Sequence, residues 1–208
     1  MAYFPFFIDV KDKKCLVIGG GKVAYRKITT LLEFEVEIHL ITKKVCPELY
    51  KLKNKINIIK KPITIEDLQN DYFFVICATN DKQVNNTIYK ACKEKNILIN
   101  AADNMKKCNF LFPAIVKKNN IITGITTSGK SPIMASNMRN NIENIIPDFY
   151  GNLTDQLGEV RNQIRNKIKN PISRKKILQK ISEKGIKLKR TLSEDEINKI
   201  IEENENNE

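Results

Sequence analysis

The sequence has few of the residues from which common metal and redox sites are built. It contains a single histidine, His39, and its five cysteines include no Cys-x-x-Cys pair. Cys15 and Cys77 lie inside apolar runs, so we expect buried, reduced thiols rather than disulfides or a metal site. His39 lies within a strand-like run, which favours a structural role. The sequence therefore identifies no metal ligands.

Long apolar segments are absent as well. No apolar run reaches the roughly 18 residues of a membrane span. The start, residues 1–7, is apolar but has neither a basic leader nor a small-residue cleavage site, so no signal peptide is expected. These features predict a cytoplasmic protein with no membrane partner.

Charge is abundant but unevenly distributed. The net charge is +12, and residues 161–190 hold twelve lysines and arginines against one acid, Glu183. Such a segment suits an acidic partner: nucleic acid, an anionic membrane or a polycarboxylate ligand. The alternative is a solvated helical face, which composition alone favours. Since the segment offers few aromatic side chains for base stacking, nucleic acid is not the expected partner.

The first half of the chain alternates between strand-like and helix-like segments. The run 72–78, for example, is continuously apolar, as expected of a strand buried on both faces. Strands are predicted at 14–18, 36–42, 56–59, 72–78 and 97–100, and helical segments at 23–33, 47–52, 66–68 and 82–95. Short links between alternating elements predict a parallel α/β sheet of the Rossmann type.

After about Asn109 the pattern changes. Two strand-like runs, 110–116 and 121–126, predict a hairpin, and Ser131-Pro132 opens a helix that ends at Pro147. From residue 148 onward the patterns are only helical, with a capping box at 193–196. The sequence thus predicts three parts: a Rossmann-like domain (1–113), a small α+β segment (114–147) and a helical C-terminal domain (148–208).

A glycine-rich loop joins the first predicted strand to the first predicted helix. Residues 19–24, Gly-Gly-Gly-Lys-Val-Ala, fit the pattern G-x-G-x-x-A in the context that gives it meaning. Gly19 permits the tight turn, Gly21 lets the backbone approach a pyrophosphate, and Ala24 allows close helix–strand packing. The helix start at Lys22 and Val23 would face the phosphates. This loop predicts dinucleotide binding; the alternative is a bare structural turn.

The ends of two further strands bear on the cofactor. An acid at the end of the second strand would bind the ribose, but Glu37 lies too early and the strand ends at Lys43 and Lys44. These lysines could favour a 2′-phosphate, so the loop alone leaves NAD and NADP both open. Thr79 and Asn80 follow the fourth strand, where ligands gather in open α/β sheets. The alternative for Asn80 and its neighbour is a helix cap, and both roles can coexist.

Six short motifs together resemble one known family. They occur in the order 6–10 (Phe-Phe-Ile-Asp-Val), 19–27, 78–81 (Ala-Thr-Asn-Asp), 100–103 (Asn-Ala-Ala-Asp), 110–114 (Phe-Leu-Phe-Pro-Ala) and 127–132 (Thr-Ser-Gly-Lys-Ser-Pro). The series resembles the precorrin-2 dehydrogenase/sirohydrochlorin ferrochelatase family, the N-terminal part of sirohaem synthases. The resemblance covers roughly residues 3–147.

The resemblance implies an activity and several roles. Family members oxidise precorrin-2 to sirohydrochlorin with NAD⁺, and some also insert Fe²⁺ into the product. NAD is implied at 19–23 and near Lys43-Lys44, and a homodimer is implied, built by residues 114–146. We therefore expect 114–147 to be a dimerisation segment.

The resemblance also implies substrate contacts. Asp103 corresponds to the family's catalytic aspartate and would act as a general base; the alternative is a capping aspartate before Asn104. Thr127, Ser128 and Gly129 resemble the loop that lines the tetrapyrrole cleft. Precorrin-2 carries acetate and propionate carboxylates, which gives the basic 161–190 segment a candidate partner.

A second class of function remains open at this point. The same glycine loop would serve a non-catalytic, NAD-sensing regulatory module, in which the dimer transmits the signal. Asp103 and the loop from residue 127 would then be structural.

Overall fold

The computed structural model describes residues 3–69, 71–102 and 104–205. The chain divides into two compact units, the first ending at Phe112 and the second starting at Pro113. No helix in these described ranges is both long and apolar enough to cross a membrane.

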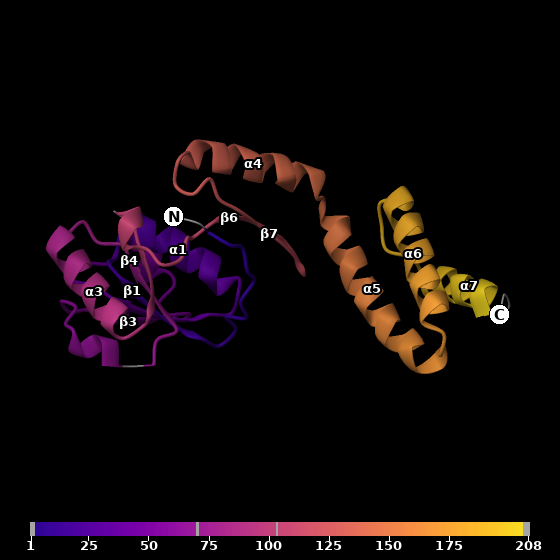
Figure 1. The fold of residues 1–208 in the computed structure, drawn as a ribbon, viewed down its shortest axis with the longest axis horizontal. Helices are drawn as coiled ribbons and strands as arrows, with labels where there is room; N and C mark the ends of the chain where they lie inside the picture. The colour runs from indigo at the N-terminus through magenta and orange to yellow at the C-terminus, as the bar shows by residue number, and fades with distance from the viewer. Residues whose placement is uncertain (1–2, 70, 103, 206–208) are drawn as a thin grey trace. The chain divides into compact units, whose positions relative to one another are not determined.

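The first unit is a five-stranded parallel sheet with helices on both faces (Figure 1). The strand order is β3-β2-β1-β4-β5, and every neighbouring pair is parallel. This confirms the predicted Rossmann-like fold. The elements are β1 (Lys14–Ile18), α1 (Lys22–Leu32), β2 (Glu37–Ile41), α2 (Pro47–Tyr50), β3 (Asn57–Ile59), η1 (Glu66–Gln69), β4 (Phe74–Cys77), α3 (Lys82–Glu94), β5 (Leu98–Ala101) and η2 (Met105–Lys107).

Alternating side chains of the central strands build two separate cores. In β1, Cys15 and Val17 pack with the buried side chains of α1 and α2, such as Ile28. Leu16 and Ile18 point to the other face and pack with those of α3. Since β1 is covered on both faces, its residues 15–18 are all apolar and buried, as expected of a strand in a doubly covered parallel sheet.

The strand predicted at 110–116 starts four residues later than expected. The run 110–116 forms a strand only from Ala114, as β6 (Ala114–Lys118). Phe110 and Phe112 instead pack against the core that α1 covers, and the Phe110 carbonyl accepts a hydrogen bond from the Asn100 side chain. Pro113 has no backbone N–H to donate to a ladder. Phe110 and Phe112 therefore pack in the first unit and are not part of the hairpin.

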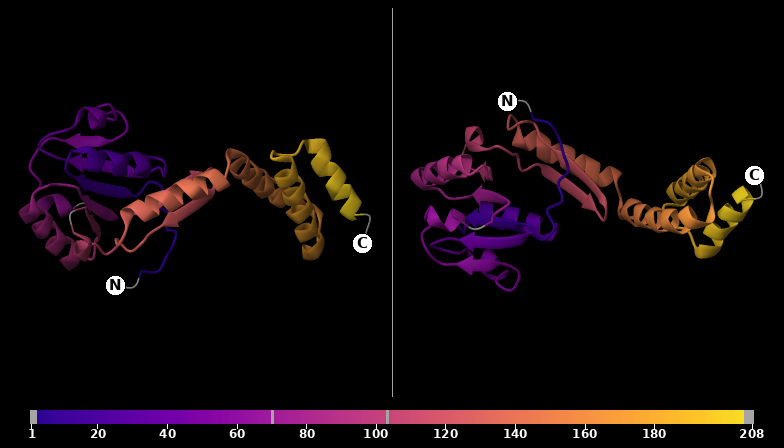
Figure 2. Two further views of the ribbon diagram at one scale, coloured as in Figure 1. Left: turned by 90° about the horizontal axis from the view of Figure 1, so that it is seen from above. Right: turned by 60° about the horizontal axis from the view of Figure 1, so that its bottom comes forward.

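The second unit begins with an antiparallel hairpin that lies along a helix (Figure 2). Its turn contains Asn119 in the left-handed region (φ 51°). The predicted helix start at Ser131 is confirmed, because the Ser131 hydroxyl accepts a hydrogen bond of 3.2 Å from the Met134 N–H. The elements are β6, β7 (Ile121–Ile125), α4 (Pro132–Ile145), α5 (Asp148–Lys167), α6 (Pro171–Leu188) and α7 (Glu194–Glu205).

The C-terminal helices share a small apolar core that includes Ile164, Ile177 and Ile197. The predicted capping box at the start of α7 is confirmed: the Ser193 N–H donates to Glu196 Oε2 (2.9 Å), and the Glu196 N–H donates to Ser193 Oγ (3.3 Å). The helical character predicted beyond residue 148 is also confirmed. The predicted domain boundaries at 113 and 147 stay predictions.

Candidate dinucleotide-binding site

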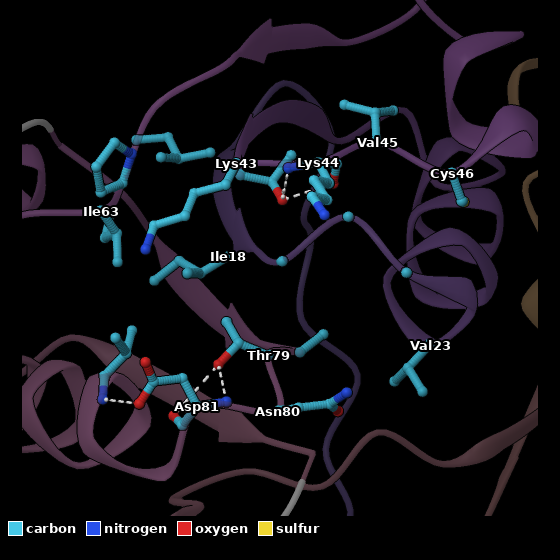
Figure 3. A pocket seen from close by; sticks show the side chains of 18 of the residues that line it. Ile18, Val23, Lys43, Lys44, Val45, Cys46, Ile63, Thr79, Asn80 and Asp81 are labelled. Atoms are coloured by element: carbon cyan, nitrogen blue, oxygen red, sulfur yellow. Dashed lines mark hydrogen bonds between the residues drawn. The ribbon is translucent and has the colours of Figure 1, made fainter.

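A pocket of about 850 Å³ opens at the carboxyl ends of β1, β2 and β4 (Figure 3). The strand order reverses between β1 and β4, so the pocket lies at the switch point where parallel α/β sheets bind ligands. Its lining includes all eight residues predicted to bind the cofactor: Gly19, Gly21, Lys22, Val23, Lys43, Lys44, Thr79 and Asn80. The structure therefore brings the whole predicted set together.

The three glycines of the loop meet different surroundings. Gly19 has φ +106°, and a Cβ there would overlap the carbonyl oxygen of Ala78. A Cβ on Gly20 would overlap the carbonyl oxygen of Lys44. At Gly21 a Cβ would meet no described protein atom within 4 Å. Gly19 and Gly20 are thus needed by the fold itself, whereas Gly21 keeps open space beside the helix start for a ligand.

The N-terminus of α1 has the features of an anion-binding site. Its N-cap is Gly21, and no side chain of the described residues caps it. The first backbone N–H groups of a helix have no partner within the helix, and the dipole there favours negative charge. Lys22 adds a positive charge at the first position, and the first turn has no acid. These features fit a dinucleotide pyrophosphate.

The end of β2 forms one side of the pocket. The buried Thr42 hydroxyl donates to the Lys44 carbonyl (2.8 Å), which fixes the turn that presents Lys43 and Lys44. Lys61, which sequence reasoning missed, also lines the pocket, and its ammonium is held 2.5 Å from Asp67 Oδ1. Lys61 follows β3, so extending the carboxyl-end rule to the third strand would have found it.

The end of β4 forms the opposite side (Figure 3). Asp81 Oδ1 accepts hydrogen bonds from the N–H groups of Gln83 (2.9 Å) and Val84 (3.1 Å), so the structure places a helix cap there, in the pocket lining. The Thr79 hydroxyl donates to Oδ1 of Asn85 (2.9 Å), a fully buried side chain that sequence reasoning missed. This bond orients Thr79 at the pocket edge.

Electrostatics and shape fit an anionic, partly aromatic ligand. Four lysines line the pocket, and Asp81 is the one acidic side chain among its described lining residues. Apolar side chains line it too, as a flat base or ring would require. These apolar residues include Ile18, Val23, Val45 and Ile63.

The residues predicted for chemistry and substrate lie elsewhere in the chain. Asp103 lies outside the described residues. Thr127, Ser128 and Gly129 form a turn in the second unit, between β7 and α4. The Thr127 hydroxyl donates to the Ser131 carbonyl (3.0 Å), and Ser128 and Gly129 have φ values of 52° and 75°. A tight turn of this kind exposes backbone groups.

His39 has the structural surroundings expected of it. Its Nδ1 lies 3.1 Å from the Tyr72 hydroxyl and its Nε2 lies 2.7 Å from Glu37 Oε1. Both ring nitrogens therefore have partners. Across residues 3–69, 71–102 and 104–205, no three histidine, cysteine, aspartate or glutamate side chains gather as a metal site requires.

A doubly covered parallel sheet with a glycine loop and an open helix start at its switch point defines a dinucleotide-binding protein. Comparison with known proteins agrees: the chain belongs to the family described as "Putative NAD(P)-binding", whose model matches residues 6–114. The chain therefore binds a nicotinamide dinucleotide through its first unit.

Individual relatives are more specific. The chain is 38% identical over 141 residues to a siroheme synthase of Buchnera aphidicola, which covers 67% of this chain and 30% of that one. It is 42% identical over 144 residues to a siroheme synthase of Blochmanniella pennsylvanica, covering 67% of this chain and 29% of that one. The chain thus spans about a third of the length of these relatives.

One solved structure matches over nearly the whole chain. "SirC, precorrin-2 dehydrogenase" superposes with a TM-score of 0.76 at 25% identity, covering 98% of this chain and 100% of that one. The resemblance to the precorrin-2 dehydrogenase/sirohydrochlorin ferrochelatase family is therefore confirmed.

Proposed function

We propose that this chain catalyses the NAD-dependent dehydrogenation of precorrin-2 to sirohydrochlorin. The observation that carries the proposal is the likeness to SirC, a precorrin-2 dehydrogenase, which extends through both units of the chain. The identity to siroheme synthases over about 141 residues supports the same reaction within sirohaem synthesis.

The cofactor in this proposal is NAD⁺, which supplies the hydride acceptor when bound. The N–H groups after Gly21 would hold the pyrophosphate, and Lys43 and Lys44 would lie beside the adenosine. Thr79 and Asn80 line the pocket on the side of β4, where they would orient the other half of the cofactor. Asp103, which follows β5 in the sequence, would take the proton that leaves the macrocycle.

The substrate would meet the second unit. Thr127, Ser128 and Gly129 offer hydroxyls and backbone groups for the tetrapyrrole. Two charges of the basic 161–190 segment have partners within the segment's own unit: Lys184 and Arg190 both pair with Glu196. Most of the others are exposed, which leaves them available for the carboxylates of precorrin-2.

The homodimer is also part of the proposal. The helix α4 buries Ala135 alone among its residues, whereas its large apolar side chains other than Ile142 are exposed. Ile133 is 77% exposed and Ile145 is 72% exposed, with Met134 and Met138 also exposed. A surface of this kind is typical of a subunit interface. It supports dimerisation through residues 114–147.

The decisive experiment is anaerobic incubation of the chain with precorrin-2 and NAD⁺, in which the absorption spectrum of the tetrapyrrole is followed. We expect sirohydrochlorin to form in step with NADH. The matched control is Gly21→Asp, which places a carboxylate in the open space for the pyrophosphate and should abolish turnover without disturbing the fold. A chain that binds NAD⁺ but leaves precorrin-2 unchanged would instead be an NAD-sensing regulatory module.

A further inference from the structure

Lys61 and the turn after β2 are joined at one backbone carbonyl. The Ile59 carbonyl, at the end of β3, accepts hydrogen bonds from the N–H groups of Thr42 (3.2 Å) and Lys61 (3.2 Å). Ile41 pairs with Ile59 in the parallel register of β2 and β3. Lys43 and Lys61 each follow that pair by two positions, so both leave the same edge of the sheet from neighbouring strands. Both line the pocket.

This edge is where the adenosine half of a dinucleotide is expected. In open α/β sheets of this kind, the ribose that carries the adenine lies at the end of the second strand. NADP⁺ differs from NAD⁺ by a phosphate on the 2′-oxygen of this ribose. Figure 3 shows the Lys43 side chain extended toward Ile63, which lies two residues after Lys61. A free ammonium on Lys61 would therefore add to the attraction of this edge for a 2′-phosphate.

The Lys61 ammonium is held by a carboxylate from outside the pocket lining. Its Nζ lies 2.5 Å from Asp67 Oδ1. The other carboxylate oxygen, Oδ2, accepts hydrogen bonds from the N–H (2.9 Å) and the hydroxyl (3.2 Å) of Thr64. The Asp67 side chain is 12% exposed, whereas that of Lys61 is 43% exposed. Among the described lining residues Lys61 is present and Asp67 is not, so the ammonium is the end of the pair that faces the ligand.

The pair has a larger effect on the pocket than on stability. An ion pair with a partly exposed partner adds little to the stability of a fold. Its electrostatic effect on a ligand is different, because a paired ammonium presents only a dipole at a distance. An unpaired ammonium attracts a phosphate over the screening length, which is about 8 Å at physiological salt. A site can discriminate between two ligands by withholding attraction from one of them.

We propose that Asp67 is a specificity-determining residue, which binds the Lys61 ammonium and thereby keeps this pocket selective for NAD⁺ over NADP⁺. It acts through Lys61 and needs no contact with the dinucleotide. This explains how a pocket edge that presents Lys43 and Lys44 can still take the cofactor without a 2′-phosphate. The proposal rests on the cofactor of the function proposed above and not on the tetrapyrrole.

The first test is Asp67→Asn, which keeps an acceptor for the Thr64 N–H but removes the negative charge. We expect the Kd for NADP⁺ to fall about fivefold or more relative to the Kd for NAD⁺, because the released Lys61 ammonium can pair with the 2′-phosphate. The gain should shrink as the ionic strength is raised. Calorimetric titration of the full chain with each dinucleotide measures both constants.

The matched control is Glu66→Gln. Glu66 is an exposed acid one residue before Asp67, so this change removes the same charge from the same turn but leaves the pair of Lys61 and Asp67 in place. The ratio of the two Kd values should then change by less than about twofold, since exposed charges are screened. An equal gain in both variants would mean that net charge, and not the pair, sets the preference.

Two lysine variants separate the pair from a structural role of Asp67. Lys61→Met combined with Asp67→Asn should return the ratio to that of wild type, because the gain requires the ammonium. Lys61→Met alone leaves the Asp67 carboxylate uncovered and should weaken NADP⁺ relative to NAD⁺. It also keeps the contacts between Thr64 and Asp67, so it decides the question if Asp67→Asn does not fold.

Several results would overturn the proposal. They are an unchanged ratio in folded Asp67→Asn, a gain that survives the loss of Lys61, an unchanged ratio in Lys61→Met, and a wild type that prefers NADP⁺. A purely structural Asp67 would lower the thermal midpoint and weaken both dinucleotides equally. These titrations need no precorrin-2. A chain that shows the expected shifts but leaves precorrin-2 unchanged would therefore refute the proposed function and support the role of Asp67.

Discussion

The carbonyl oxygen of Lys44 occupies the space that a Cβ on Gly20 would need. The Cys46 N–H also donates to the Gly20 carbonyl (2.8 Å). The glycine loop and the turn after β2 therefore pack directly against each other in the pocket lining. The middle position of the glycine motif is therefore fixed by a contact within the protein.

This contact predicts opposite behaviour for two neighbouring glycines. Gly20→Ala should lower the free energy of unfolding by about 1–3 kcal/mol, because backbone must move to make room. Gly21→Ala should leave stability unchanged but weaken dinucleotide binding, since its Cβ would enter open space. Thermal unfolding without ligand and an NAD⁺ titration measure the two effects. Equal stability of the two variants would contradict the steric account.

Cofactor choice can be tested at the end of β2. We expect NAD⁺ to bind more tightly than NADP⁺, despite the positive charge of Lys43 and Lys44. A double variant, Lys43→Ala with Lys44→Ala, separates the two possibilities when both dinucleotides are titrated. If wild type binds NADP⁺ more tightly than NAD⁺ and the double variant loses this preference, these lysines bind the 2′-phosphate.

The role of Asp103 is tested by Asp103→Asn, which keeps the size and much of the capping capacity but removes the base. We expect dehydrogenase turnover to fall on the order of 10²-fold or more. NAD⁺ affinity and the thermal midpoint should change little. Normal turnover would show that Asp103 does not act as a base, and an unfolded variant would show that it is a structural cap.

The charge of the partly buried Lys27, whose ammonium donates to Asn100 Oδ1, predicts how stability depends on pH. Its pKa falls from 10.5 to about 8 on folding, so the folded chain binds fewer protons than the unfolded chain between these values. The cost of the buried charge, up to about 3 kcal/mol, is complete below pH 8 and vanishes above about pH 10.5. Lys27→Met should therefore gain most stability over wild type at or below pH 7, and the gain should shrink as pH rises. A difference independent of pH from 7 to 10.5 would contradict this.

Dimerisation through α4 is tested on its exposed apolar side. Ile145→Glu should convert a dimer into a monomer, because a charge placed in an apolar interface is costly to desolvate. The matched control is Asn144→Glu, a change at an exposed neighbour. The mass of each protein in solution, measured by light scattering, decides the outcome. A monomeric wild type would refute the proposed dimer.

The sequence predicts the sheet well because its signals are local. The apolar runs and the glycine loop mark each strand and the first helix start, and residue 131 marks the start of α4. No local sequence pattern of this kind identifies Asn85 or Lys27. Their importance comes from partners far along the chain, Thr79 at the edge of the pocket and Asn100 on β5.

Gly20 shows the same limit. In the pattern G-x-G-x-x-A, any residue is allowed at the position of Gly20. The structure allows only glycine there, because a Cβ would overlap the carbonyl oxygen of Lys44, on the turn after the next strand. The sequence predicts a strand at Phe110 and Phe112 because they lie in a strand-like run. Their tertiary contacts with the core of the first unit decide otherwise. Local patterns thus specify the elements, and contacts between elements specify the site.

The open start of α1 links the folding of this chain to the supply of its ligand. Only the folded chain presents those N–H groups, so a bound dinucleotide raises the free energy of unfolding by mass action, about 2.7 kcal/mol at a free concentration one hundred times the Kd. The lifetime of the protein should then follow the dinucleotide pool. Depletion of that pool would leave more of the chain open to proteolysis, and the amount of enzyme would fall together with its cofactor.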